Sequence, residues 1–312
     1  AAMETSITNA SDTPALETLY IYVNTADEGD PEVYERPKSL DAALGILAGD
    51  DWTVLAGGTD VYPVATDAFA WGRPAPTRIL DISAIDELSG IQEQNDCFRI
   101  GSRVTWTELV EYDLPRYFDG LKQAGREVGG VQIQNRGPLV GNICNAPPAA
   151  DGVPPLIAMD ADVEIASTTG TRTLPVSDFL QGNRRTALGE SELVTAILVP
   201  KHGAAARSTF LKLGARRYLV ISIAMVAAVI DCDNDNRILH ARIAVGSCSA
   251  VAQRLPELEE ALVGSIRDRS IGTILTSAML SPLSPIDDVR GDAGYRQSSA
   301  VTLVRRLLTK IG

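Results

Sequence analysis

Cysteine, histidine and aromatic residues are all scarce in this sequence of 312 residues. It has two histidines, aromatic residues make up 5%, and the four cysteines, which include no Cys-x-x-Cys pair, are Cys97, Cys144, Cys232 and Cys248. Neither His202 nor His240 lies near a cysteine or a cluster of carboxylates. Zinc or iron–sulfur ligation by this chain alone is therefore poorly supported, and hydrolysis at a Ser-His-Asp or Cys-His centre is not expected. Dispersed cysteines of this kind favour reduced thiols in the cytosol.

The sequence also lacks an excess of positive charge and a long apolar run. Lys and Arg number 28 against 40 Asp and Glu, which gives a net charge of −12. Such a surface repels phosphate backbones, so we expect no nucleic-acid partner. The longest apolar run, residues 218–230, is too short to span a bilayer and is interpreted as buried core. Residues 1–14 are polar and have no signal-peptide pattern, so we expect a cytoplasmic protein without a membrane span.

Local patterns in the first third of the chain predict both helices and strands. Ser39 or Asp41 can cap a helix over residues 40–47, because both side chains accept backbone hydrogen bonds at a helix start. Short apolar runs rich in β-branched residues favour strands. The expected strands cover residues 52–56, 78–82 and 98–100, and a further helix follows Thr105 or Thr107 and ends at Tyr112.

The composition changes after this region. Residues 125–155 are dominated by glycine, asparagine, proline and alanine with little periodicity, which predicts a long, loop-rich element of the kind that often carries function. Strand patterns then return, and helical stretches follow near the end of the chain. The expected strands are 162–167, 192–199, 210–213, 221–230 and 237–245, and the expected helices are 257–263, 272–279 and 298–309. An α+β chain follows, with a domain boundary between Pro200 and Arg207.

The polar segment 231–236 lies between two of the expected strands. Its sequence, DCDNDN, is similar to the start of a calcium-binding loop, but it lacks the glycine and the distal glutamate of an EF-hand. We therefore interpret it as the turn of a hairpin.

A Gly-Gly pair directly after an expected strand forms the first candidate ligand loop, Leu55-Ala56-Gly57-Gly58-Thr59-Asp60. Without a Cβ, the glycine backbone can approach an anion closely, and a threonine hydroxyl and a helix start add donors for a phosphate. The segment matches neither the Rossmann fingerprint nor the P-loop. The alternative is a plain strand-to-helix turn that Thr59 or Asp60 caps.

The second candidate loop, residues 132–151, has the sequence QIQNRGPLVGNICNAPPAAD. So many Asn, Gly and Pro residues predict special backbone conformations and amides that are free to bind a ligand. Asp151 follows small apolar residues, so we expect it to be partly buried and to need a hydrogen-bond donor, which a ribityl hydroxyl could supply. The alternative is a structural loop in which Asp151 caps a helix that starts near Pro154.

Together, the two loops strongly resemble the FAD-binding subunit of the xanthine dehydrogenase and carbon monoxide dehydrogenase family, the molybdenum hydroxylases. The resemblance extends over nearly the whole chain after the first fifteen or so residues. The further segments that carry it are IGSRVTWTEL at 100–109, LPVSDF at 174–179, RTAL at 185–188, ELVTAI at 192–197 and FLKLGARR at 210–217. It implies an α+β fold in which a PCMH-type FAD-binding domain of two α/β subdomains, residues 16–203, precedes a smaller α+β C-terminal domain, residues 204–312.

The resemblance also assigns roles to single residues. Leu55, Ala56, Gly57, Gly58, Thr59 and Asp60 would wrap the FAD pyrophosphate, and Gly141, Asn142 and Asn145 would continue the nucleotide site. Asp151 would bind the ribityl or adenosine side, and Leu188 would pack near the ring system. Lys212 would lie beside the isoalloxazine as the catalytic cation, because a positive charge stabilises the reduced flavin. The alternatives are an ordinary core leucine at 188 and a solvated strand lysine at 212, and no metal site is expected in this chain.

One stretch departs from the family pattern. The family usually has Thr-Ile/Val-Gly-Gly before the first asparagine of the second loop, whereas this chain has Pro138-Leu139-Val140-Gly141. Pro138 removes a hydroxyl and an N–H donor, and Val140 adds a Cβ. The departure motivates one alternative, a flavin-depleted structural subunit. A stand-alone flavin oxidase and a generic anion-binding module are the others.

The resemblance implies a division of labour with partner chains. One partner would carry the molybdenum cofactor that hydroxylates the substrate, and a second would carry two [2Fe–2S] clusters. The present chain would take electrons from those clusters on FAD and pass them to NAD⁺, oxygen or another acceptor. A dimer of heterotrimers is the expected assembly. No residue of this chain would contact the hydroxylated substrate.

Overall fold

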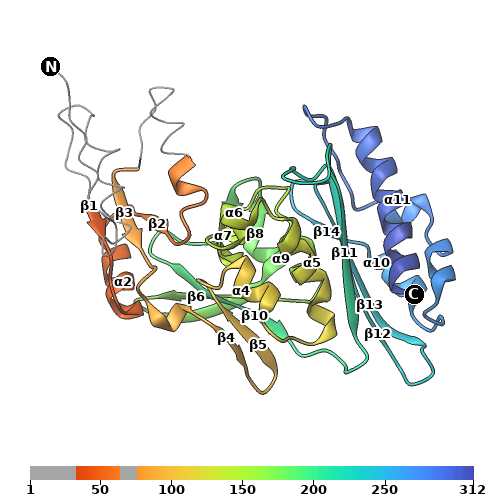
Figure 1. Ribbon diagram of the computed structural model, residues 1–312, viewed down its shortest axis with the longest axis horizontal. Coiled ribbons are helices and arrows are strands. Elements are labelled where there is room, and N and C mark those ends of the chain that lie inside the picture. Colours follow the sequence, from red (N-terminus) through yellow and green to blue (C-terminus); the bar gives the residue numbers. More distant parts are fainter. Residues whose placement is uncertain (1–32, 64–75) are drawn as a thin grey trace, which may run out of the picture.

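The computed structural model describes residues 33–63 and 76–312 of the chain. Within them, three larger sheets follow one another along the long axis of the molecule (Figure 1). Each sheet contributes to a different part of the buried core, and the connections between the sheets position the two candidate loops. Among the described residues, no helix combines the length and the apolar character needed to cross a membrane.

The N-terminal unit is a small parallel sheet packed on one helix. Its strands, in the order β1-β3-β2, are β1 (Val33–Glu35), β3 (Arg78–Asp81) and β2 (Thr53–Leu55). Helix α2 (Leu40–Leu47) begins at Ser39, whose hydroxyl accepts a hydrogen bond from Ala42 N at 3.3 Å. The prediction of this helix and of its serine cap is confirmed. Strand β2 ends at Leu55, so the first candidate loop leaves the carboxyl end of a parallel strand.

The central unit is an antiparallel sheet in the order β4-β5-β10-β6-β7. Its strands are β4 (Ile91–Glu93), β5 (Cys97–Gly101), β10 (Leu193–Pro200), β6 (Asp162–Ser167) and β7 (Gly170–Pro175). Short 3-10 turns η1 (Asp86–Leu88) and η2 (Arg116–Phe118) precede β4 and the helix α5 (Asp119–Glu127), and a two-stranded ribbon pairs β8 (Leu180–Gly182) with β9 (Arg185–Thr186).

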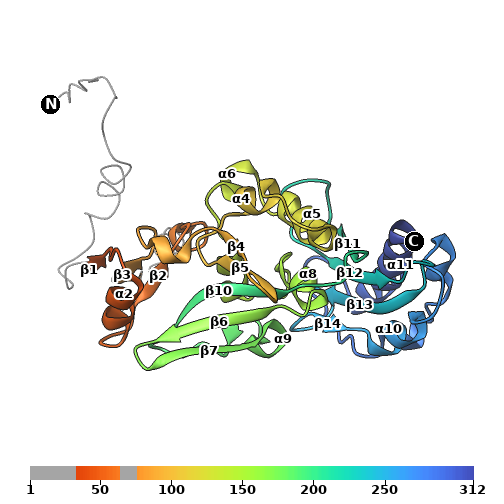
Figure 2. The same cartoon turned by 90° about the horizontal axis from the view of Figure 1, so that it is seen from below.

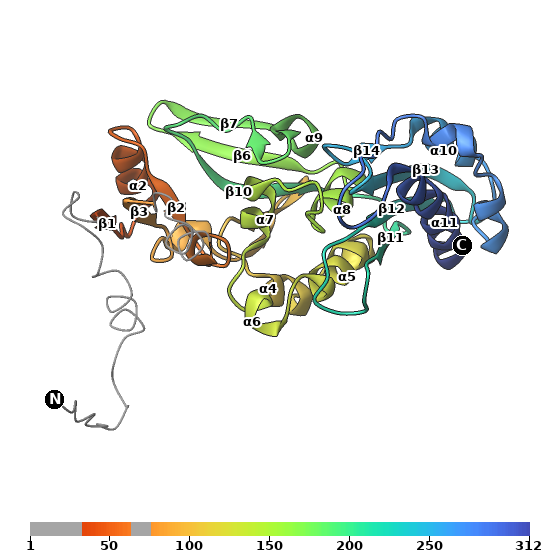
Figure 3. The same ribbon diagram turned by 90° about the horizontal axis from the view of Figure 1, so that it is seen from above.

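Helices cover this central sheet on one side. Figures 2 and 3 both show α4 (Trp106–Glu111), α5 and α6 (Val131–Gln134) on the same side of the five strands. Helix α4 begins with a capping box in which Thr105 and Glu108 each accept from the other's backbone, at 3.2 and 2.7 Å. Thr105, rather than Thr107, is therefore the cap.

The loop-rich interpretation of residues 125–155 is wrong in part. This segment contains α6, α7 (Leu139–Asn145) and the start of α8 (Val153–Ala158), and α9 (Val176–Phe179) follows β7. These helices are only one to two turns long, too short for an apolar period of 3.6 residues to show. The asparagine, glycine and proline residues lie mainly at their ends, where such residues are favoured.

The C-terminal unit is a four-stranded antiparallel sheet covered by helices on its outer face (Figure 1). Its strands are β11 (Arg207–Leu213), β12 (Ala224–Cys232), β13 (Ile238–Gly246) and β14 (Gln253–Arg254), and its helices are α10 (Pro256–Leu262) and α11 (Ala293–Ile311). The predicted hairpin across 231–236 is confirmed by the pairing of β12 with β13. The predicted helix over 272–279 is wrong: two 3-10 turns, η3 (Arg269–Thr273) and η4 (Ser277–Leu280), form there instead.

Strand β12 is buried on both faces, and this joins the C-terminal unit to the central one. Met225, Ala227 and Val229 pack into the core of the central unit. Ala224, Val226, Ala228 and Ile230 point the other way, into a separate core with α10 and α11. A strand buried on both faces has a continuous apolar sequence, which accounts for residues 224–230 of the longest apolar run. The interpretation of the whole run as buried core is wrong at its start, because Tyr218, Leu219 and Ile221 are 68%, 57% and 53% exposed.

Candidate functional site

The first candidate loop presents unpaired backbone donors at the end of β2. Leu55 is 3% exposed and anchors the loop in the core. The N–H groups of Gly57, Gly58, Thr59 and Asp60 find no acceptor within the described part of the chain. Gly58 adopts φ +74°, a left-handed conformation that favours glycine. Consecutive free N–H groups at such a bend form a concave site for an anion.

The second candidate loop lies directly against the first. A Cβ placed on Gly57 would overlap the carbonyl oxygen of Arg136, and one placed on Gly137 would lie 3.3 Å from the hydroxyl of Thr59. Pro138 then starts α7, with the N–H groups of Val140 and Gly141 also without an acceptor in the described residues. The structure therefore brings residues 57–59 and 136–141 together, although about eighty residues separate them.

A side-chain bridge continues this contact. The Asn145 amide donates to the carboxylate of Asp60 at 3.0 Å, and Arg184 donates to the Asn145 carbonyl oxygen at 2.9 Å. Arg184 itself adopts φ +53° in the ribbon between β8 and β9, with its N–H bonded to Ala146 O. Three segments that are distant in sequence thus meet at Asn145, on the last turn of α7.

Asn142 has a structural contact within the second loop. Its Oδ1 accepts a hydrogen bond from Gly152 N at 3.1 Å, which closes the chain between α7 and α8. Gly141 lies beside the ring of Pro138, with a placed Cβ 3.2 Å from that ring. Val140 is 4% exposed and its side chain belongs to the central core. The extra Cβ at 140 therefore points into the protein interior.

Asp151 and Lys212 form a buried ion pair between the central and the C-terminal units. The Lys212 ammonium lies 2.7 Å from Asp151 Oδ2, with side-chain exposures of 6% and 9%. The Ser222 hydroxyl donates to the other carboxylate oxygen at 2.6 Å. Burial raises the pKa of Asp151, while the Lys212 charge and the two hydrogen bonds oppose that rise.

Asp151 is buried and has hydrogen-bond donors, as expected. The donors are Lys212 and Ser222 of the protein rather than a ribityl hydroxyl. Lys212 also donates to the carbonyl oxygens of Glu127 and Val220, both at 3.3 Å. Its ammonium thus has three acceptors on three segments. Gly152 is the N-cap residue of α8 and no side chain caps this helix, so Asp151 does not cap it. Lys212 is also not a solvated strand residue.

Leu188 lies near the ribbon that carries Arg184. It is partly buried and packs against the central core, and its N–H donates to the Thr186 hydroxyl at 3.4 Å. Arg172 stabilises the segment that carries Leu188. It donates to Ala187 O at 2.8 Å and forms an ion pair with Glu192 at 2.7 Å. Leu188 therefore packs against the central core, a few residues after Arg184 in the chain.

Two residues of this region were not found by sequence reasoning, Arg184 and Ser222. Arg184 directly precedes the RTAL segment, but no local pattern shows that an arginine there takes a left-handed backbone and reaches Asn145. Ser222 lies in the long apolar run after Lys212. A single hydroxyl within such a run is a signal that a buried polar group needs a partner.

The described part of this site contains neither an activated thiol nor a cluster of metal ligands. Within the described ranges, no three His, Cys, Asp or Glu side chains gather as metal ligands would. Burial raises the pKa of Cys144 to about 12 and that of Cys248 to about 11, and it also raises those of Cys97 and Cys232. Protonated thiols are poor nucleophiles.

Comparisons with known proteins match this architecture over almost the whole chain. A family model described as the FAD binding domain in molybdopterin dehydrogenase matches residues 27–202, and one described as the CO dehydrogenase flavoprotein C-terminal domain matches residues 209–311. The nicotine 6-hydroxylase medium subunit of Paenarthrobacter nicotinovorans is 30% identical over 89% of this chain and 96% of its own. The carbon monoxide dehydrogenase medium chain of Hydrogenophaga pseudoflava is 28% identical over 88% and 95%.

Solved structures show the same likeness. A chain of carbon monoxide dehydrogenase from Hydrogenophaga pseudoflava superposes with a TM-score of 0.81 at 28% identity, covering 90% of this chain and 97% of that one. A chain of quinoline 2-oxidoreductase from Pseudomonas putida 86 gives a TM-score of 0.80 at 25% identity, covering 90% and 97%.

Proposed function

The chain belongs to the FAD-binding subunits of the molybdenum hydroxylases, the family of xanthine and carbon monoxide dehydrogenases, and we propose how it works within such an enzyme. It takes electrons from [2Fe–2S] centres of a partner subunit on its FAD and passes them to NAD⁺, oxygen or another acceptor. A third chain carries the molybdenum cofactor. The assembly is a dimer of heterotrimers, and the domains of this chain are residues 16–203 and 204–312.

The observation that carries this proposal is the pairing of the two loops. Their facing segments hold six backbone N–H groups, those of residues 57–60, 140 and 141, that have no acceptor in the described part of the chain. Unpaired donors are uncommon in folded proteins, because each one loses a hydrogen bond. A diphosphate supplies many acceptor oxygens in one small volume. The residues present therefore fit the pyrophosphate of FAD.

The other site residues would orient the rest of the cofactor. Leu55, Ala56, Gly57, Gly58, Thr59 and Asp60 hold the pyrophosphate, with Gly141, Asn142 and Asn145 beside them on α7. Leu188 would face the ring system. FAD supplies the two-electron chemistry when bound. Lys212 would act on the ring through its charge, with Asp151 and Ser222 fixing the ammonium in place.

The buried pair defines what Lys212 can do. An ammonium with three acceptors cannot donate a fourth hydrogen bond, because Lys carries three donors. Asp151 also balances its charge at 2.7 Å. Lys212 would therefore influence a bound flavin by electrostatics over a distance rather than by a direct bond. In this proposal it is a positioning residue that also joins the two units.

The alternatives rest on weaker observations. Pro138 and Val140 motivated a flavin-depleted structural subunit, yet Val140 belongs to the core and Pro138 bridges to Thr105. A stand-alone flavin oxidase would require a substrate pocket within this chain, and an anion-binding module would not require the α7 bridge to Asp60. No observation in the described residues favours any of the three over the electron-transfer subunit.

Rapid mixing of the native complex tests the proposal. The complex is reduced with dithionite and mixed with NAD⁺ or with oxygen, while the flavin and iron–sulfur absorbances are followed. We expect flavin and clusters to reoxidise together in the intact complex. In a complex stripped of FAD, we expect cluster reoxidation to slow by at least about a hundredfold, since the route to the acceptor is lost. Equal rates with and without FAD would contradict the proposal.

A further inference from the structure

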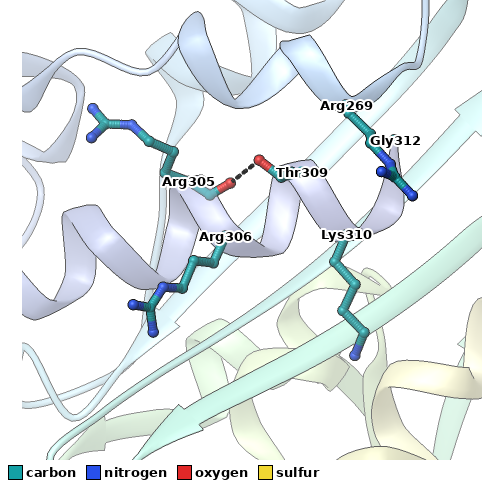
Figure 4. A pocket seen from close by; sticks show the side chains of 6 residues that line it. All are labelled: Arg269, Arg305, Arg306, Thr309, Lys310 and Gly312. Carbon is teal, nitrogen blue, oxygen red and sulfur yellow. Dashed lines mark hydrogen bonds between the residues drawn. The ribbon is translucent and has the colours of Figure 1, made fainter.

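Four cationic side chains gather at the far end of the C-terminal unit. A shallow depression of about 580 Å³ is lined by Arg269, Arg305, Arg306, Thr309, Lys310 and Gly312. Three of the cations project from the last turns of α11, and Arg269 comes from the adjacent η3. Figure 4 shows these side chains spread outward over the surface in different directions. In Figure 1, this end of α11 and α7 lie on opposite sides of the four-stranded sheet.

These cations have no acidic partner in the described residues. All four are exposed, and none takes part in an ion pair there; Lys310 donates weakly to Gln123 at 3.4 Å. The helix dipole favours a cation in the last turn, which accounts for Lys310. The effect fades within that turn, so it does not account for Arg305, Arg306 or Arg269. In a chain of net charge −12, a local cluster of positive charge without acidic partners is a distinctive feature of the surface.

More arginines lie close to the same elements. Arg267 precedes η3 by two residues, and its Nη1 atom is buried without a partner in the described residues. Arg116 and Arg267 repel Arg207 on β11 and so lower its pKa. Of these three arginines, Arg116 forms an ion pair in the described residues, with Asp119 at 3.7 Å. Repulsion between Arg207 and these two arginines is relieved when an anionic surface covers them.

We propose that this basic surface docks an acidic patch of a partner subunit in the assembled enzyme. The inference rests on the proposed function, because it needs a complex with other chains. Cations that spread over an open depression suit a broad acidic protein surface, whereas a small anion needs donors that converge on one point. The net charge of the chain disfavours a nucleic acid. The contact lies away from the candidate flavin loops, so it serves assembly rather than electron delivery.

Zero-length crosslinking of the native complex tests the contact directly. A carbodiimide joins an amine to a carboxylate only when the two are in salt-bridge contact, and Lys310 is the amine of this surface. We expect mass spectrometry to find Lys310 bonded to an Asp or Glu of a co-purified subunit, with a yield that falls as salt is raised. Crosslinks of Lys310 only to its own chain, or none in an intact complex, would overturn the proposal.

Charge variants give an independent test. We expect R305E/R306E to weaken assembly at least about tenfold at low salt, measured as the concentration at which the complex dissociates. R305K/R306K keeps both charges and should assemble normally. Lys38→Glu, at an exposed lysine near α2, controls for a charge reversal elsewhere on the surface and should have no effect. Unweakened assembly in R305E/R306E contradicts the proposal.

The outcomes also separate this inference from the proposed function. The flavin content and the reoxidation rates of R305E/R306E should stay normal wherever the complex is intact. If phosphate or anionic vesicles bind the chain through Arg305 and Arg306 while assembly is unaffected, the surface is an anion site and the docking proposal is wrong. The proposed function fails by a different result, equal cluster reoxidation rates with and without FAD in the native complex.

Discussion

Two residues, Lys212 and Asp151, form a buried ion pair between the central and C-terminal units. Both side chains are almost fully buried, and Ser222 completes the hydrogen bonding of the carboxylate. Buried ion pairs cost much desolvation energy when they form, so they add little net stability. Removing one partner is different, because the other charge is left buried and unpaired.

We therefore expect Lys212→Met to lower the free energy of unfolding by about 3–5 kcal/mol. The double variant Lys212→Met with Asp151→Asn should recover part of that loss, because no unpaired charge remains and Ser222 can still bond the amide. Chemical denaturation of the wild-type protein, of Lys212→Met, of Asp151→Asn and of the double variant measures these values. Strictly additive effects of the two substitutions would show that the pair does not couple.

The same lysine tests the electrostatic role at the flavin. In Lys212→Ala we expect FAD to stay bound while acceptor reduction slows, because a positive charge near the ring is lost. Stopped-flow rates on the intact complex measure this effect. Unchanged turnover with normal flavin content would leave the residue a purely structural role.

Gly58 is constrained by both its backbone conformation and a neighbouring side chain. Its φ of +74° is strained for any side chain, and a placed Cβ would overlap the ring of Tyr62. We expect Gly58→Val to deform the loop and to reduce FAD affinity by at least about a hundredfold. Flavin content per chain measures it, with the melting temperature as a check on folding. Normal flavin content in a folded variant would remove this loop from the pyrophosphate site.

The roles of single residues could be predicted only where those residues belong to a recognisable sequence motif. The AGGTD loop and the asparagines of α7 stand out because Gly-Gly and Asn-rich runs favour backbone conformations that ordinary helices and strands do not use. The link from Arg184 to Asn145, and that from Ser222 to Asp151, join segments 39 and 71 residues apart. Such contacts depend on how the sheets pack, and no local pattern encodes that packing.

Among the elements, the connection from β10 to β11 carries an acid-sensitive contact. His202 lies there, with Nε2 3.0 Å from Met159 O and its ring edge-on to Tyr117 at 4.9 Å. Burial, followed by repulsion from Arg242, lowers the pKa of His202 below its ordinary value of 6.5. The folded protein therefore binds a proton at this ring less readily than the unfolded chain.

This shift predicts a loss of stability in acid. A group whose folded pKa is lowered contributes stability above its unfolded pKa and loses it as pH falls through the folded value. We expect the melting temperature to drop as pH falls below 6.5, and His202→Phe to flatten that slope. His240→Gln, at an exposed histidine, is the control and should keep the slope. An unchanged slope in His202→Phe would contradict the assignment.

Elements with strong local signals were predictable, and short ones were not. The serine-capped α2 and the β12–β13 hairpin follow from a cap and from a polar turn between apolar runs. Helices α6 and α7 span four and seven residues and leave no periodic signal. The two 3-10 turns η3 and η4 have the apolar content of a helix, but each ends after four or five residues.

At the scale of the whole molecule, the fold places the candidate ligand site near its middle and one charged surface at its end. The candidate flavin loops lie where the N-terminal and central units meet, and the sheet of the C-terminal unit packs its inner face on the central core. The basic depression lies on the outer side of that sheet, with α11 (Figure 1). The chain can thus contact one partner with the end of α11 while the flavin loops remain accessible to another.

The central claim is that this chain holds FAD between its two loops. The most direct test is an absorbance spectrum of the purified chain, before and after heat release of any bound chromophore. We predict bands at about 370 and about 450 nm, as flavins show, and a released chromophore that is FAD. A colourless chain that also fails to take up added FAD would contradict the claim and leave the chain a structural role in its complex.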